Sequence, residues 1–493
     1  MRRRALFLLW LCLAIPAWPA PPVKVSVNPA ALTVPLGESR AARWTGPAAP
    51  GLEVADPAVA EAWLEGSRIV VRGLAAGDTS VTLLFPDRML DVPVRVRRPA
   101  ASFPATLNVS LTGRQVGQEV LRQAIEAALN PAPGAQVSYS TRSVKGQTIL
   151  DVAASGPGLL ATSGSIRLEV TLQEMDFAPA RTLAVSNRPE LVGFPGVLLE
   201  RPLPAGPSRL LVHHRGSPDY PSQDLEVVLR NVNATPARVR VTLAMVGPSP
   251  DEIYVGHLAA QRMITMQQKG ESFVLRIPPG GQAVIDRRRL KAGWTVSGMG
   301  WLEPLDGAQV RVVVRAVEDG APPTSAESPE VRPARTGRGL FSPAVDLAYA
   351  HHAGGPFTFI PLGEQPYETD PETGESNPGN FGMVYRVQVH LYNPTAETRQ
   401  AWIDFVPRAG PARGSLFVDG ERVETDMGTH AEELRLGEWE LAPGEERDVW
   451  IETFPQSGSN YPVFLVVKSE YGNGTVPAAP PRQATPSESR YIY

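Results

Sequence analysis

The feature that most constrains the fold is an internal duplication, because residues 185–320 and 340–470 carry the same landmarks in the same order. Each copy has a histidine pair before a glycine, then a strand-like run that ends in Asn, then a Pro-Gly turn. The matched segments are 210–216 with 347–354, 227–231 with 389–393, and 277–280 with 441–444. Each copy closes on an apolar run, 310–317 and 464–469. This order predicts two copies of one structural unit.

Both copies alternate apolar and polar residues with a period of two, as half-buried strands do. The clearest runs are 385–391 and 239–245. The chain of 493 residues also contains 44 Gly and 50 Pro, which suits many short strands joined by turns. Strands separated by Asn and Pro-Gly turns predict antiparallel β-sandwiches. The copies resemble the fibronectin- or immunoglobulin-like repeats of exported bacterial proteins, a likeness that implies a fold and no particular ligand.

Residues 23–98 are predicted to form a separate domain of alternating strands. Its turn-and-strand spacing runs through Asn28-Pro29, Gly37-Glu38, 56–60 and 73–81. This region resembles the bacterial immunoglobulin-like (group 2) domains and the N-terminal region of secretin-type pilus-assembly proteins. The resemblance implies a noncatalytic domain of the cell envelope. No secretin pore region follows, so it does not extend to a channel.

Residues 101–178 are predicted to form a small α+β domain. A helix is expected over 117–130, where Leu121, Ile125 and Leu129 share one face, and strands are expected near 148–153 and 166–172. Such a unit serves either as a docking module or as a structural spacer. The sequence thus predicts a mostly β, multidomain chain of immunoglobulin-like and β-sandwich domains with one small α+β unit.

The N-terminus has the pattern of a secretory signal peptide, predicted to span residues 1–22. Arg2, Arg3 and Arg4 precede the apolar stretch 5–15, and Ala17 and Ala20 offer cleavage points. An uncleaved anchor is the alternative, although the stretch is shorter than the roughly 20 residues that cross a bilayer. The mature chain would then have no transmembrane span.

Cleavage would remove the three arginines and Cys12, the one cysteine of the chain, and would move the formal net charge from −4 to about −7. The mature chain would then contain no disulfide and no thiolate ligand. An acidic protein without a basic cluster is a poor nucleic-acid binder. The tail 472–493 is rich in Pro, Ser and Ala and is predicted to be disordered.

Two candidate metal sites can be named. The pairs His213-His214 and His351-His352 recur at matching places, and neutral imidazoles bind transition metals well. Adjacent strand residues point to opposite faces, so the two pairs would have to face each other or recruit further histidines. The alternative is that each pair packs at the end of a strand.

The second candidate is a calcium site in the loop 368–377. Asp370, Glu372 and Glu375 supply carboxylates beside a glycine, and Ca²⁺ takes six to eight oxygen ligands. Pro371 and the incomplete Asp-x-Asp pattern favour the alternative, a solvated acidic loop. The sequence indicates no other cofactor.

Trp294 and Trp301 flank a glycine-rich turn and are candidates for stacking on a sugar ring. Packing in the core is the alternative. No Gly-x-Ser-x-Gly elbow, His-Glu-x-x-His helix, phosphate loop or dinucleotide fingerprint occurs. The sequence therefore favours an exported, noncatalytic cell-envelope protein, in the periplasm or on the surface, that binds an envelope protein or a surface polysaccharide. The predicted contacts are the Trp-bearing turns and the insertions 256–269 and 357–380. The alternatives are a carbohydrate-binding module and an envelope hydrolase with a carboxylate pair.

Overall fold

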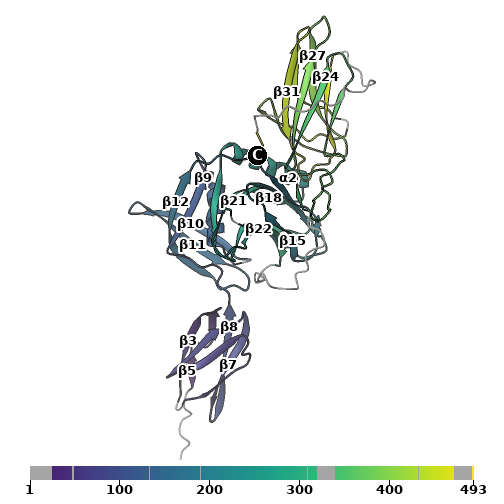
Figure 1. The fold of residues 1–493 in the computed structure, drawn as a ribbon. Helices are drawn as coiled ribbons and strands as arrows, with labels where there is room; N and C mark the ends of the chain where they lie inside the picture. The colour runs from purple at the N-terminus through teal and green to yellow at the C-terminus, as the bar shows by residue number, and fades with distance from the viewer. Residues whose placement is uncertain are drawn as a thin grey trace, which may run out of the picture. The chain divides into compact units, whose positions relative to one another are not determined.

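The computed structural model describes residues 25–46, 49–132, 134–188, 190–307, 309–318, 339–430, 432–470 and 491–492. Within them lie 32 strands and two helices, which makes the chain mostly β as predicted (Figure 1). The chain divides into two compact units, residues 1–99 and 100–493. In the described part of the chain, no helix is long and apolar enough to cross a membrane. The predicted signal peptide lies outside the described residues.

The first unit is a β-sandwich of two four-stranded sheets, ordered β1-β3-β6-β5 and β2-β8-β7-β4. Alternate residues of these strands, such as Val92, Val94 and Val96, fill one core between the sheets. The immunoglobulin-like architecture expected for 23–98 is therefore present. Its strands are β1 (Ser26–Asn28), β2 (Leu32–Pro35), β3 (Ser39–Thr45), β4 (Gly51–Val54), β5 (Ala60–Glu65), β6 (Arg68–Gly73), β7 (Gly77–Phe85) and β8 (Arg88–Arg97).

The second unit begins with one helix and four strands. The helix buries Val120, Ile125 and Leu129 and ends at Asn130, whose φ of 44° lies in the left-handed region that often terminates helices. The predicted helix and strands are thus present. The elements are β9 (Thr106–Thr112), α1 (Gln118–Leu129), β10 (Gln136–Val144), β11 (Gln147–Ser155) and β12 (Thr162–Gln173).

The first of the two copies follows. Its strands β15-β22-β17-β20 form one sheet, and β19-β18-β21-β16-β13-β23 belong to the other. The elements are β13 (Thr182–Ser186), β14 (Leu191–Val192), β15 (Gly196–Leu203), β16 (Ser208–Gly216), β17 (Gln223–Asn231), β18 (Ala237–Ser249), α2 (Glu252–Gln268), β19 (Ser272–Ile277), β20 (Gln282–Leu290), β21 (Thr295–Leu305), β22 (Val310–Val317) and β23 (Leu340–Phe341).

The segment 101–178 and the first copy share one sheet, whereas the sequence predicted two separate domains. Strand β9 pairs antiparallel with β19, so the strands continue from one segment into the other in an 11-stranded sheet. Arg240 on β18 reinforces the junction. Its guanidinium donates to the carbonyl oxygens of Asp176 and Met175 at 2.8 and 2.9 Å and lies over the rings of Phe177 and Trp301. Period-two patterns do not show which strand edges meet, so the sequence could not predict this pairing.

The second copy is a sandwich of the sheets β24-β26-β31-β28-β29 and β25-β32-β27-β30. Its core includes Val387, Val389 and Ile403. Leu183, Val185 and Leu211 of the first copy pack into the same core. The strands are β24 (Ala344–His352), β25 (Thr358–Leu362), β26 (Val384–Tyr392), β27 (Arg399–Pro407), β28 (Ser415–Val418), β29 (Glu421–Glu424), β30 (Leu434–Leu441), β31 (Glu446–Thr453) and β32 (Val463–Ser469).

The duplication is visible in the strand pairing of the two sandwiches. Strand β17 pairs with β20 and β18 with β19, as β26 pairs with β31 and β27 with β30. In both copies a buried Asn joins the two turns. Asn231 Nδ2 donates to the carbonyl oxygens of Thr235, Ile277 and Pro278, and Asn393 Nδ2 donates to those of Glu397, Leu441 and Ala442. The Asn and Pro-Gly landmarks are therefore parts of one repeated turn.

The other matched landmarks lie on strands that do not correspond. Next to β18, the sheet continues through β21 to β16. Next to β27, the sheet continues through β32 to β25. The pair His213-His214 lies on β16, which runs antiparallel to β21, whereas His351-His352 lies on β24, which runs parallel to β26. The closing strand β22 likewise has no counterpart in β32. The histidine and closing-strand matches are thus similarities of sequence without structural equivalence.

Helix α2 joins the two sandwiches. A Cβ on Gly256 would come within 1.7 Å of the Ser457 carbonyl oxygen, so only glycine allows the turn 456–458 to pack this closely. His257 Nδ1 lies 2.9 Å from Gln456 Oε1, and Ser297 Oγ lies 2.6 Å from Ser457 Oγ. The insertion 256–269 is helical as predicted, and its Gly256 and His257 pack against the second sandwich.

Most of the predicted disordered tail lies outside the described residues, but its end is described. Ile492 is fully buried, and its backbone N–H donates to Glu452 Oε2 at 2.9 Å. The Tyr491 ring stacks on Phe417 with 5.3 Å between centroids. These two residues depart from the disorder prediction, because apolar and aromatic side chains at the end of a polar tail found a core to pack into.

Candidate functional site

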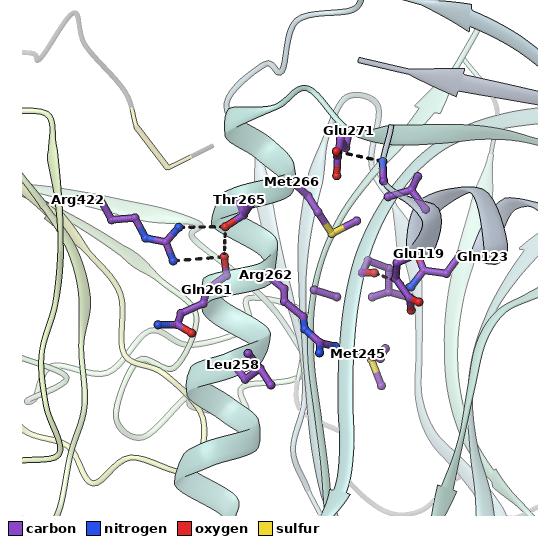
Figure 2. Close-up of a pocket in the computed structure, with 14 residues that line it drawn as sticks. Glu119, Gln123, Met245, Leu258, Gln261, Arg262, Thr265, Met266, Glu271 and Arg422 are labelled. Atoms are coloured by element: carbon purple, nitrogen blue, oxygen red, sulfur yellow. Dashed lines mark hydrogen bonds between the residues drawn. The ribbon is translucent and has the colours of Figure 1, made fainter. Parts of the chain in front are cut away.

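A groove of about 540 Å³ lies between α1 and α2, over β18 (Figure 2). Its floor is mainly apolar, with Val120, Leu243, Met245, Leu258 and Met266. The lining also includes Gly117, Ala244 and the charged and polar residues Glu119, Gln123, Gln261, Arg262, Thr265, Glu271 and Arg422. An apolar concave surface with a few polar groups is the usual form of a binding site.

The wall formed by α1 is fixed by two hydrogen bonds. The Glu271 carboxylate accepts from the Gly117 backbone N–H at 3.2 Å, which places a negative charge at the helix N-terminus. Gln123 Nε2 donates to the Leu243 carbonyl oxygen at 3.0 Å and ties the helix to β18. Both side chains therefore hold the wall in place.

The wall formed by α2 is fixed at its start and along its length. Asp251 caps the helix by accepting from the Tyr254 backbone N–H at 2.9 Å. Arg422, from β29 of the second sandwich, donates to Thr265 Oγ1 at 3.0 Å and to the Gln261 carbonyl oxygen at 3.4 Å (Figure 2). The groove is thus assembled from the α1 segment and both sandwiches.

The carboxylates of the groove are engaged with groups of the protein itself. A hydrogen bond from Arg122 to Glu119, with further attraction by Arg122, Arg288 and Arg262, outweighs burial and lowers the pKa of Glu119. Glu119 is therefore ionised near neutral pH. Glu271 accepts a hydrogen bond at the N-terminus of α1. Among the residues that line the groove there is no serine, cysteine or histidine to act as a nucleophile or base.

The two histidine pairs serve different purposes. His214 Nε2 lies 2.9 Å from Ser186 Oγ, and His351 lies 3.2 Å from Thr358 Oγ1 and 3.1 Å from Ser469 Oγ. Burial, with the nearby His352, lowers the pKa of His351 to about 4, so this ring is neutral. His352 is exposed and meets the Tyr392 ring edge-on. In the described part of the chain, these four histidines do not gather around one point. The four-histidine metal site is therefore not formed.

The predicted calcium loop folds around Asp370 in a way that uses its carboxylate. Asp370 Oδ1 accepts the backbone N–H groups of Glu372 and Thr373, and Oδ2 accepts that of Leu340. Burial raises the pKa of Asp370, but these N–H groups outweigh burial and hold the pKa below its usual value. Glu375 pairs with Arg188 at 3.3 Å and Glu372 is exposed. Within the described ranges, the carboxylate oxygens of Asp370, Glu372 and Glu375 do not gather within 4.8 Å of one another.

The two tryptophans differ in exposure. Trp301 is fully buried, packs edge-on against Phe177 at 4.6 Å between centroids, and donates its indole N–H to the Ala178 carbonyl oxygen. It cannot reach a ligand, because Phe177 and Arg240 lie against its ring. Trp294 is 37% exposed and carries Lys291 over its ring. The paired sugar platform is therefore not present.

Sequence reasoning missed the groove. It predicted helices in the segments 256–269 and 117–130, but it did not predict that both helices border one groove. Helix α2 carries one Leu and two Met, and both Met263 and Met266 are buried, so its composition gives no signal of the groove.

No protein-family model and no curated protein matches this sequence. Solved structures that resemble parts of the chain are multidomain β proteins. Domains 1–6 of the surface layer protein SbsC share 18% identity over 29% of this chain and 26% of that one, with a TM-score of 0.15. Titin immunoglobulin tandem A164–A165 shares 9% identity over 29% of this chain and 92% of that one, with a TM-score of 0.13.

A third similar structure is the M60 catalytic domain with two CBM51 domains of Clostridium perfringens ZmpB. It shares 10% identity over 90% of this chain and 55% of that one, with a TM-score of 0.18. The chain spans about a quarter of the SbsC surface layer structure named above. At these TM-scores the likeness says nothing about activity, and the β-sandwich assignment rests on the sheets described above.

Proposed function

We propose that the chain is an exported, noncatalytic protein of the cell envelope that binds an apolar segment of a partner protein in the groove between α1 and α2. The observation that carries the proposal is the groove itself. Its floor is apolar, while its carboxylates and Arg422 are bound to neighbouring parts of the chain. The proposal of export rests on the Arg-rich, apolar N-terminus.

The structure supports the groove over the loops as the contact surface. The loop 357–380 is held by its own buried Asp370, Asn377 and Asn380. In contrast, Leu258 on α2 is only partly buried and borders the open groove. A partner side chain placed against Leu258 and Met266 would remove apolar surface from water at little cost in charge desolvation.

We expect Leu258→Asp to abolish recovery of the partner when the full chain is purified from its native cells, because a carboxylate would be buried against an apolar ligand. The loss should be at least about tenfold, since one buried charge costs more than 1.4 kcal/mol of binding free energy. Leu172→Asp is the matched control, because Leu172 is 53% exposed on β12. Equal recovery with both variants would contradict the assignment of the groove.

A further inference from the structure

Three side chains from separate elements meet near the start of α2. His213 lies on β16, Glu252 is the first residue of α2, and Glu190 directly precedes β14. One ring nitrogen of His213 and one carboxylate oxygen of each glutamate all lie within 4.8 Å of one another. It is the one such cluster of at least three His, Cys, Asp or Glu residues within the described ranges.

One nitrogen of the His213 ring has no hydrogen-bond partner that would explain its burial. The side chain is 7% exposed, and its Nδ1 atom is buried without a hydrogen-bond partner among the described residues. A neutral imidazole has one ring nitrogen with a lone pair, which can act as a metal ligand. Buried polar nitrogens are normally bonded, so an unsatisfied one requires an explanation.

The two carboxylates also lack a counter-charge. Within the described part of the chain, neither Glu190 nor Glu252 forms an ion pair with Lys or Arg, although their oxygens lie within 4.8 Å of each other. Two like charges at this separation repel each other unless a cation lies between them. The cluster therefore combines two carboxylate oxygens with one imidazole nitrogen.

The backbone holds the three positions before any ion binds. The Arg215 N–H donates to the Glu190 carbonyl oxygen at 2.7 Å, and β14 pairs with the end of β16. Asp251 caps α2 directly before Glu252. The turn of the second sandwich packs on the same helix end, because a Cβ on Gly458 would lie 2.1 Å from the Glu252 carbonyl oxygen. Ligands fixed in this way lose little freedom on binding.

From this geometry we propose that Glu190, His213 and Glu252 bind one transition-metal dication of the Zn²⁺ type, which fastens the start of α2 to β16. Zn²⁺ takes imidazole nitrogen and carboxylate oxygen at about 2.0–2.2 Å, so small side-chain rotations would close the three ligands around it. A hard cation such as Ca²⁺ prefers oxygen ligands alone and would leave the imidazole unused. The site is separate from the proposed partner groove.

The test is titration of the full, untagged chain with Zn²⁺ after removal of metals by a chelator. We expect one Zn²⁺ per chain, a rise in the melting temperature, and tetrahedral d–d absorption when Co²⁺ replaces Zn²⁺. Glu190→Gln and Glu252→Gln should each weaken binding at least about tenfold. Because both positions are at least partly accessible, these variants keep the fold even if His213→Ala does not.

Two matched variants serve as controls for adventitious binding. His352→Ala removes an exposed histidine, and Glu372→Gln removes an exposed carboxylate of the loop 368–377. Both should bind Zn²⁺ as the unmodified chain does. The proposal is overturned if the unmodified chain holds no Zn²⁺ at micromolar concentrations, if Glu190→Gln and Glu252→Gln bind it unchanged, or if Ca²⁺ competes with equal affinity.

Discussion

Replacing Glu226 with alanine is expected to lower the free energy of unfolding of the second unit by about 3–5 kcal/mol. Glu226 is fully buried on β17 between two arginines. Its Oε1 accepts from Arg287 Nε at 2.8 Å and its Oε2 accepts from Arg315 Nε at 2.8 Å. Removal of the carboxylate would leave two largely buried guanidiniums without a counter-charge, which costs more than the ion pairs themselves contribute.

This network also links two parts of the unit. Arg287 Nη1 donates to the carbonyl oxygen of Ala132 at 3.1 Å, in the segment that follows α1. Equilibrium unfolding in urea measures the effect, with Glu169→Ala as the control because Glu169 is an exposed carboxylate on β12. A loss below about 1 kcal/mol for Glu226→Ala would mean that the arginines find other partners or water.

Replacing Asn393 with alanine is expected to cost about 3 kcal/mol of unfolding free energy, since it removes the hydrogen bonds of both Nδ2 and Oδ1 and leaves carbonyl oxygens without donors. Its Nδ2 donates at 2.8 Å to Glu397, at 2.9 Å to Leu441 and at 3.2 Å to Ala442. Its Oδ1 accepts from the Thr395 backbone N–H at 3.0 Å. Asn393→Asp keeps the acceptor but cannot donate, so it should be nearly as damaging.

The duplication makes this prediction stricter, because Asn231 occupies the same place in the first copy. Asn231→Ala should destabilise the first sandwich by a similar amount, whereas Asn108→Ala, at an exposed position on β9, should change stability by less than about 0.5 kcal/mol. The measurement is again equilibrium unfolding in urea, monitored by tryptophan fluorescence. If the Asn393 variant is as stable as the unmodified chain, the repeated turn does not depend on this side chain.

The sequence predicted the fold class and the strands well, because alternation and turn residues are local signals. Val387 and Val389 are buried, and Asn231 and Asn393 close equivalent turns. It failed where non-local contacts decide. The pairing of β9 with β19 and the packing of α2 on the turn at Ser457 depend on strand edges and on Gly256, which no periodic pattern reveals.

For the candidate sites, too, the sequence failed where non-local contacts decide the outcome. The histidine pairs and the acidic loop were read as sites from residue type, yet Asp370 and His351 are occupied by neighbouring groups of the fold. His213 was named for a metal, but its partners in the cluster, Glu190 and Glu252, lie on other elements and carry no motif. Likewise, the groove needs α1, β18 and α2 to come together, and only the structure supplies that.

The most direct test of the central claim is site-specific photo-cross-linking in the native cells, with the reactive side chain placed at Arg262 on the groove. We expect one discrete cross-linked envelope protein that disappears when Leu258→Asp is added, and no such product from a probe at Leu172. If the Arg262 probe captures nothing while Leu172 or the loop 357–380 captures a partner, the groove is not the binding site and the proposal is wrong.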